Sequence, residues 1–262
     1  MIRLLKKTAV VAAGLSVLVA SQALALSPVE TPYFKKMIAK GKIPPIAERL
    51  PAEPKIVKFS GERSIGQHGG NLRTLIGRSK DVRYLVVWGY ARLMGYDHNF
   101  EMHADILKEY KVEEGRIFTF TLRKGHKWSN GDAFTSEDFR YWWEDVANNK
   151  SISPSGPPVA MLADGKLPMF EVLDEVTVRY TWDTPNPFFL SRLAGASPLF
   201  VYRPSDYLKK FHAKYSDETA LNKMAKEEGQ RNWAALHNRL DNMYKFNNPD
   251  QPTLQPWANI TR

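Results

Sequence analysis

The sequence predicts an α/β fold, because segments with the period of a strand alternate along the chain with segments that have the period of a helix. Residues 117–122 alternate apolar and polar side chains, as a half-buried strand does, and an amphipathic helix follows from Thr135. A second alternating segment covers residues 172–182, and two helical segments follow at 218–228 and 233–246. These elements are enough to enclose a sizeable core.

The segment from residue 116 to residue 148 carries the clearest local signals. The apolar side chains of its strand fall on one face and are Phe118, Phe120 and Leu122. Asn130-Gly131 predicts a tight turn. Thr135 is expected to cap the helix that follows, and Asp138 completes a capping box three residues later.

The helix after Thr135 is rich in aromatic residues. Its apolar face has the spacing i, i+3, i+4, i+7 and consists of Phe139, Trp142, Trp143 and Val146. We therefore expect both tryptophans in the core. The acidic residues Glu137, Glu144 and Asp145 are expected on the opposite, solvated face rather than as a catalytic carboxylate pair.

Proline and glycine divide the rest of the chain. Residues 26–60 form a proline-rich segment that we expect to extend over the surface, apart from a short helix at 32–39 that ends before Gly41. A glycine turn within residues 66–76 is expected to lead into a strand, and it lacks the Lys-Ser/Thr pair of a phosphate-binding loop. Asn186-Pro187 predicts the start of another helix, with Asn186 as its cap.

The first 25 residues have the three parts of a secretory signal peptide. The positive residues at its start are Arg3, Lys6 and Lys7. An apolar core at 8–20 follows, and Ala23-Leu24-Ala25 is a cleavage site with small residues. The core is too short for a membrane-spanning helix, which takes about 20 residues. We therefore expect cleavage before Leu26.

Composition argues against several kinds of chemistry. The chain contains no cysteine, so we expect no disulfide, no thiolate nucleophile and no lipid attachment through cysteine. The net charge of +9 becomes +6 without the three basic residues of the signal peptide, and the remaining basic residues are scattered, so we expect no nucleic-acid partner. His98 and His103 are one residue too far apart for a zincin motif, and no G-x-S-x-G elbow occurs. The sequence therefore predicts no metal site, no cofactor and no catalytic residues.

One aromatic cluster suggests a candidate binding site. Residues 85–96 are apolar on most faces, so we expect a buried element there, and they contain Trp88, Tyr90 and Tyr96. Either these rings pack in the core, or Trp88 and Tyr90 line a ligand cleft. Aromatic rings suit a cleft because they combine a large apolar area with a polar group.

Two stretches resemble a known protein family. Residues 118–146 read FTFTLRKGHKWSNGDAFTSEDFRYWWEDV, and residues 199–215 read LFVYRPSDYLKKFHAKY. Both resemble the family 5 extracellular solute-binding proteins of ABC transporters, of the oligopeptide- and dipeptide-binding type. Asp206 stands where the family usually has a histidine. The resemblance extends over most of residues 30–257, and members of the family are considerably longer than this chain.

The resemblance implies that residues 61–262 form the first lobe of a two-lobed periplasmic binding protein of type II, with a mixed sheet and surrounding helices. We expect the sequence to be an N-terminal fragment that ends before the second lobe and that binds its solute poorly by itself. The implied function is that of a monomeric, periplasmic substrate-binding component, which captures peptides or related solutes for the inner-membrane permease of an ABC importer by closing two lobes. Oligosaccharides and nickel chelates are alternative solutes within the family, and a secreted hydrolase is the alternative from another class.

Overall fold

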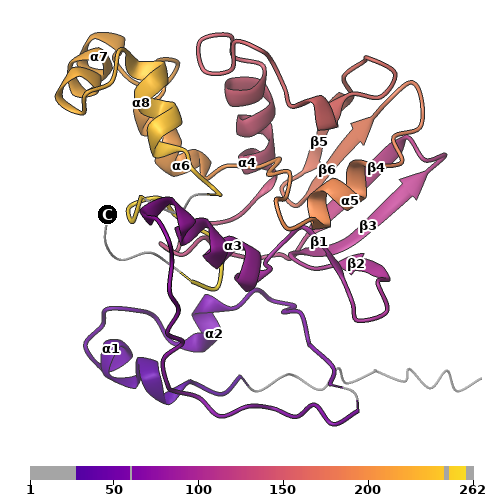
Figure 1. Cartoon of the computed structure of the whole chain (residues 1–262), viewed down its shortest axis with the longest axis vertical. Helices are drawn as coiled ribbons and strands as arrows, with labels where there is room; N and C mark the ends of the chain where they lie inside the picture. The colour runs from indigo at the N-terminus through magenta and orange to yellow at the C-terminus, as the bar shows by residue number, and fades with distance from the viewer. Residues whose placement is uncertain (1–27, 60, 245–247, 258–262) are drawn as a thin grey trace, which may run out of the picture.

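The structure, a computed structural model, describes residues 28–59, 61–244 and 248–257. Two β-sheets lie beside short helices, which confirms the predicted α/β class (Figure 1). The predicted signal peptide, residues 1–25, lies outside the described residues. None of the helices in the described part of the chain combines the length and apolar character needed to cross a membrane.

A four-stranded sheet forms one side of the core. In spatial order its strands are β3 (Leu107–Glu113), β4 (Ile117–Leu122), β6 (Thr177–Thr181) and β5 (Met169–Asp174). β4 confirms the predicted strand, and its buried side chains are Phe118, Phe120 and Leu122. The expected mixed sheet is not found among the described strands, which all pair antiparallel. Short turns join β3 to β4 and β5 to β6, and a hairpin connection makes its two strands antiparallel.

The strand predicted at 172–182 is instead a hairpin of β5 and β6, in which Val172 lies opposite Val178. The side chain of Asp174 accepts a hydrogen bond from the backbone N–H of Val176 at 2.8 Å, which holds the turn between the strands. Val176 keeps the alternation of apolar residues that continues into β6. The pattern alone therefore does not reveal where one strand ends and the next begins.

The capped helix after the Asn130-Gly131 turn is confirmed at its start. The hydroxyl of Thr135 accepts a hydrogen bond from the N–H of Glu137 at 3.3 Å, and Asp138 accepts one from the N–H of Thr135 at 3.0 Å. α4 (Ser136–Arg140) then continues as a π-helical segment, η3 (Tyr141–Ala147). A π-helix has more residues per turn than an α-helix, so the spacing of the sequence no longer decides which side chains face the core.

Asp145, on η3, is buried, contrary to the prediction that it lies on a solvated face. It is 4% exposed, and it accepts hydrogen bonds from Lys214 at 2.6 Å, Tyr215 at 2.6 Å and Arg140 at 3.0 Å. A distant segment therefore covers this face of the helix and pairs the charge. The residues buried as predicted are Phe139, Trp142 and Val146. Trp143 is half-buried and packs against the core.

The helices after the sheet differ in how well they match the sequence pattern. α5 (Phe189–Ala194) begins later than predicted, because Asn186 is buried with its N–H bound to the carbonyl of Gly115 at 2.9 Å and does not cap the helix. α6 (Ser205–Leu208) is a single turn. α7 (Glu218–Glu227) matches its prediction.

α8 (Trp233–Leu240) is shorter than the helix predicted at 233–246. Just after its last residue, the carboxylate of Asp241 binds the guanidinium of Arg203 at 2.6 Å. The side-chain amide of Asn248 donates a hydrogen bond to the carbonyl of Leu240 at 3.2 Å. Partners that are distant in sequence therefore stabilise the end of this helix, and the local pattern does not contain that information.

The N-terminal arm, residues 28–59, lies below the rest of the chain in Figure 1. Its helices are η1 (Pro32–Phe34) and α1 (Lys35–Ala39), which were predicted, and α2 (Ile46–Arg49), which was not. None of these described arm residues is buried. Polar contacts attach the arm to the rest of the chain, among them the bond from the N–H of Ala52 to the carbonyl of Lys124 at 2.9 Å and the ion pair of Lys55 with Asp105 at 2.5 Å.

Residues 66–76 do not form the predicted strand. Their backbone is irregular, and Leu72 and Leu75 are exposed. A strand needs a neighbouring strand to bond its backbone, and no described strand pairs with this segment. The elements that follow are the 3-10 helix η2 (Ser79–Arg83), α3 (Tyr84–Gly89), β1 (Met94–Tyr96) and β2 (Met102–Ala104). Of these, β1 and β2 form a second, small sheet. The stretch from α3 to β1 includes residues 85–96, where a buried element was expected: Val86, Leu93 and Met94 are buried, but Trp88 is half exposed.

Candidate ligand-binding site

α3 presents two aromatic side chains on one face. Trp88 follows Tyr84 by one helical turn, and their rings stack with centroids 5.7 Å apart and an interplanar angle of 18°. Val86 anchors the helix because it is fully buried. Trp88 is 50% exposed. Tyr84 and Trp88, which we call the aromatic pair, therefore offer an accessible and ordered apolar surface.

Tyr90 follows α3 and is bound to the end of α5. Its backbone is left-handed, with a φ of 47°, and its hydroxyl donates a hydrogen bond to the carbonyl of Ala194 at 2.8 Å. The guanidinium of Arg92 lies 4.7 Å from the centre of its ring and donates to the carbonyl of Gly195 at 2.9 Å. The hydroxyl of Tyr90 is thus engaged within the protein, and only part of its surface is accessible.

A third aromatic residue lies beside α3. A Cβ atom at Gly89 would be 3.0 Å from the ring of Pro256 and 3.4 Å from Trp257, so the chain packs closely here because Gly89 has no side chain. Trp257 is about as exposed as Trp88. Neither Tyr84 nor Trp257 was predicted from the sequence as a site residue. The i, i+4 spacing of the aromatic pair could have revealed Tyr84, whereas no local pattern connects Trp257 with Gly89.

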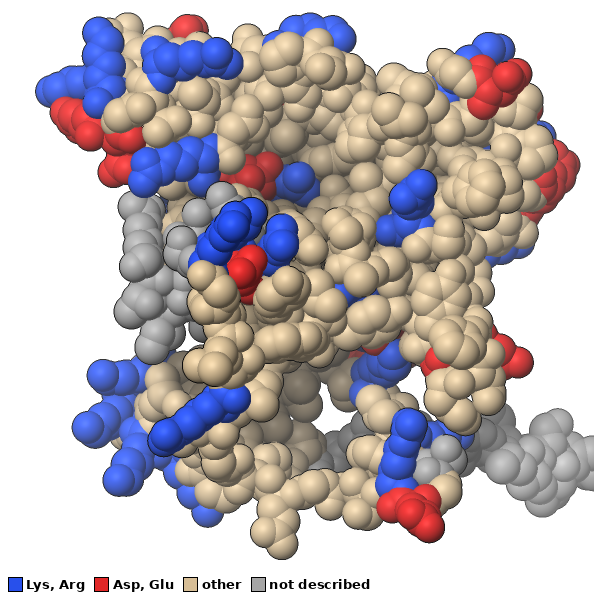
Figure 2. Space-filling model, in the orientation of Figure 1, with Lys and Arg blue, Asp and Glu red and all other residues tan. Residues whose placement is uncertain are grey.

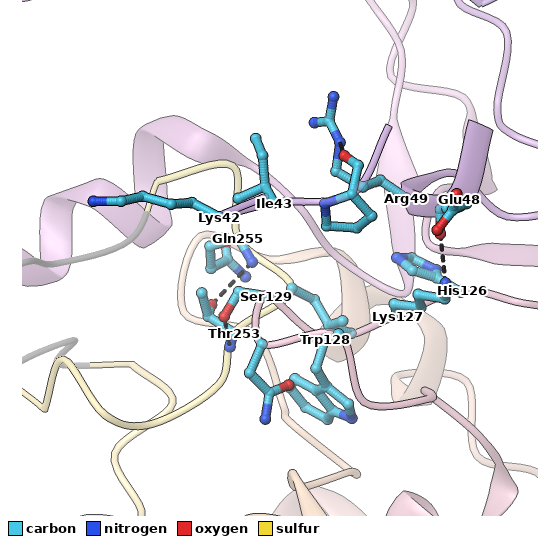
Figure 3. Close-up of a pocket in the computed structure, with 14 residues that line it drawn as sticks. Lys42, Ile43, Glu48, Arg49, His126, Lys127, Trp128, Ser129, Thr253 and Gln255 are labelled. Atoms are coloured by element: carbon cyan, nitrogen blue, oxygen red, sulfur yellow. Dashed lines mark hydrogen bonds between the residues drawn. The ribbon is translucent and has the colours of Figure 1, made fainter. Parts of the chain in front are cut away.

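A cavity of about 530 Å³, which we call the arm cavity, lies between the arm and the rest of the chain (Figure 3). Its lining comes from residues 42–44 and 48–49 of the arm, from the loop 126–131 and from residues 253–255. The predicted site residues Trp88 and Tyr90 do not belong to this lining. The structure therefore places the aromatic pair and the arm cavity at two different sites.

The histidines and acids considered as metal-binding or catalytic groups have other surroundings. His98 is exposed, and Nδ1 of His103 lies 3.0 Å from the carbonyl oxygen of Ala104. In the part of the chain that the structure describes, no group of three or more His, Cys, Asp or Glu residues is placed to hold a metal ion. Arg140 pairs at 2.6 to 3.0 Å with three acids, which are Glu137, Glu144 and Asp145. These carboxylates therefore form an ion-pair network.

Comparison with protein families identifies a matching family. The model of the bacterial extracellular solute-binding proteins, family 5 (middle), matches residues 101–245, which is more than half of the chain. The match includes β2 to β6, α4 and all the described helices that follow α4.

Two relatives illustrate how much of a longer protein the chain resembles. The periplasmic alpha-galactoside-binding protein of Rhizobium meliloti (strain 1021) is 31% identical in an alignment of 206 residues that covers 71% of this chain and 29% of that protein. The periplasmic murein peptide-binding protein MppA of Escherichia coli (strain K12) is 28% identical in an alignment of 115 residues that covers 39% of this chain and 21% of that protein. The chain thus matches less than a third of the length of each.

Solved structures share the fold. An oligopeptide-binding protein, OppA, superimposes with a TM-score of 0.78 and 30% sequence identity over 90% of this chain and 36% of that one. The periplasmic binding protein MelB of Agrobacterium fabrum C58, solved in complex with stachyose, has a TM-score of 0.59 and 22% identity over 91% of this chain and 36% of that one.

Proposed function

The chain belongs to the bacterial extracellular solute-binding proteins, family 5, and we propose that it serves an ABC importer by capturing a small solute for the membrane permease. We propose a binding role rather than catalysis. The relatives are named as binding proteins, and the acids of α4 and η3 are engaged by Arg140.

The accessible aromatic pair is the observation that supports solute capture most directly. Stacked rings provide a large contact area at little cost in conformational entropy, because their side chains have few rotatable bonds. The proposed solute is a peptide or a related compound, as the name of the relative MppA suggests. An oligosaccharide of the alpha-galactoside type is the second candidate, because the relative from Rhizobium meliloti matches 71% of the chain.

We also propose a periplasmic location. The relatives are named as periplasmic proteins, and residues 1–25 have the composition of a secretory signal peptide. The described residues would supply one wall of the solute cleft, with the aromatic pair on it. One wall leaves much of a ligand in water, so we expect this chain to bind its solute weakly.

Titration calorimetry with trialanine and with stachyose tests this function. We expect weak, saturable heat with one of the two, and we expect Trp88→Ala to remove it because that change deletes half of the aromatic pair. Phe100→Ala is the matched control, since Phe100 is an exposed aromatic residue outside α3. If neither solute gives saturable heat, or if Phe100→Ala weakens binding as much as Trp88→Ala, the proposal fails.

A further inference from the structure

The arm cavity has the size of a small-molecule site and walls that are held in place. Its volume of about 530 Å³ lies within the range of roughly 300–1,000 Å³ that is usual for ligand pockets. The N–H of Ser129 donates to the carbonyl of Thr253, and the N–H of Thr253 donates to the hydroxyl of Ser129, both at 3.0 Å. Gln255 donates its side-chain Nε2 to the carbonyl of Ala91 at 3.0 Å (Figure 3 shows the residues of this wall). The two bonds of Ser129 join the loop to residues 253–255, and the bond of Gln255 joins that segment to Ala91.

The lining of the arm cavity is mainly positive. Its cations are Lys42, Arg49 and Lys127, and its acid is Glu48. The ammonium of Lys127 donates to the backbone carbonyl of Glu48, which leaves two of its three donors for a ligand. Arg49 is partly engaged by Glu30 at 2.6 Å. The nearby helix α1 adds further lysines, and Figure 2 shows basic side chains gathered where α1 lies. Such a surface attracts anions.

Two buried polar atoms of the lining have no hydrogen-bond partner among the described residues, namely Oε1 of Gln255 and Nδ1 of His126. Gln255 is only 8% exposed. Burial, together with the nearby charge of Arg123, lowers the pKa of His126 to about 4, so its ring is neutral at neutral pH. The amide oxygen needs a donor, and the imidazole nitrogen needs a donor or an acceptor according to its tautomer. A hydroxyl group fits both atoms because it can donate and accept.

We propose that the arm cavity binds a small hydroxylated carboxylate, such as a sugar acid. The carboxylate would lie against the ammonium group of Lys127, which Figure 3 shows beside His126, because charge-assisted hydrogen bonds are strong. The hydroxyl groups would complete the hydrogen bonding of Gln255 and His126. This second site is separate from the aromatic pair and does not depend on the function proposed above.

Titration calorimetry with three matched probes tests the chemistry of the arm cavity. Gluconate carries a carboxylate and hydroxyl groups, sorbitol carries hydroxyl groups alone, and hexanoate carries a carboxylate alone. We expect gluconate to bind saturably. Sorbitol and hexanoate should each bind at least about tenfold more weakly, because each lacks one set of hydrogen bonds. Lys127→Met should weaken gluconate binding by about tenfold, because it removes the charged donor proposed to bind the carboxylate.

Two further variants place the binding in the arm cavity. Lys40→Met removes an exposed lysine of the same arm that lies outside the lining, so gluconate should bind as before. Trp88→Ala should also leave gluconate binding unchanged. The proposal is overturned if gluconate does not bind, if hexanoate binds as tightly as gluconate, or if Lys40→Met weakens binding as much as Lys127→Met.

Discussion

The indole Nε1 of Trp128 donates a hydrogen bond to the carboxylate of Asp138 at 3.1 Å, and both residues are buried. The same carboxylate accepts the N–H of Thr135 at 3.0 Å and the N–H of Ser205 at 2.9 Å. Asp138 therefore connects the turn before α4, the start of α4 and the start of α6. A single buried carboxylate therefore accepts hydrogen bonds from three segments of the chain.

This arrangement predicts a pH-dependent contribution of Asp138 to stability. Burial raises its pKa to about 6, from an ordinary value of 3.8, although its hydrogen bonds act in the opposite direction. The folded chain therefore holds a proton that the unfolded chain releases between these values, so stability falls as pH rises through that window. The shift corresponds to about 3 kcal/mol.

Denaturant unfolding of the parent chain and of Asp138→Asn checks this contribution, because asparagine cannot ionise. From about pH 4 to about pH 7, the free energy of unfolding of the parent chain should fall by about 2–3 kcal/mol relative to the variant. If the free energies of unfolding of the two chains change with pH in parallel, folding does not raise the pKa of Asp138, and the prediction is wrong.

His237 should act in the opposite direction. It is fully buried, its Nε2 lies 2.8 Å from the hydroxyl of Tyr141, and burial lowers its pKa to about 4 from 6.5. The unfolded chain binds a proton more readily in this window, so the contribution to stability is present above about pH 6.5 and is lost as pH falls toward about pH 4. Relative to His237→Gln, the parent chain should lose about 3 kcal/mol over this range. A constant difference between the two chains would contradict the prediction.

Two tryptophan-to-alanine changes should have very different effects on stability. Trp142 is 2% exposed in the core, so Trp142→Ala should lower the free energy of unfolding by about 3–5 kcal/mol. Trp88→Ala is the matched control, because Trp88 is half exposed and should cost only about 1 kcal/mol. Equal costs in denaturant unfolding would mean that η3 does not pack its aromatic face into the core.

Export should remove residues 1–25. The expected mature chain begins at Leu26, because the cleavage site Ala23-Leu24-Ala25 follows a short apolar core. Intact-mass measurement of protein recovered from the periplasm of a bacterial host checks this. A mass that corresponds to a chain starting at Met1 would contradict it.

The elements that the sequence predicts well depend on neighbouring residues. The alternation at 117–122 produces β4, and Thr135 caps α4 through a side chain that reaches only the next turn. Gly229 follows α7 with a φ of 68°, a conformation that favours glycine. In each case, the interactions that decide the structure lie within a few residues along the chain.

The features that the sequence does not predict depend on distant partners. Asp145 is buried because Lys214 and Tyr215 cover it, and α8 ends where Asn248 binds its last carbonyl. Dependence on distant segments also separates the two candidate binding sites. Trp88 was identified as a candidate from its own segment, whereas the arm cavity requires three segments that only the folded chain brings together.

The most direct test of solute capture by the aromatic pair is the NMR signal of the indole N–H of Trp88, assigned by its loss in Trp88→Phe. Addition of trialanine or of stachyose to residues 26–262 should shift this signal in a saturable way for the solute that binds. The indole signal of the buried Trp142 should stay in place and serve as the internal reference. If either solute binds by calorimetry while the Trp88 signal does not move, the aromatic pair is not the solute-binding surface.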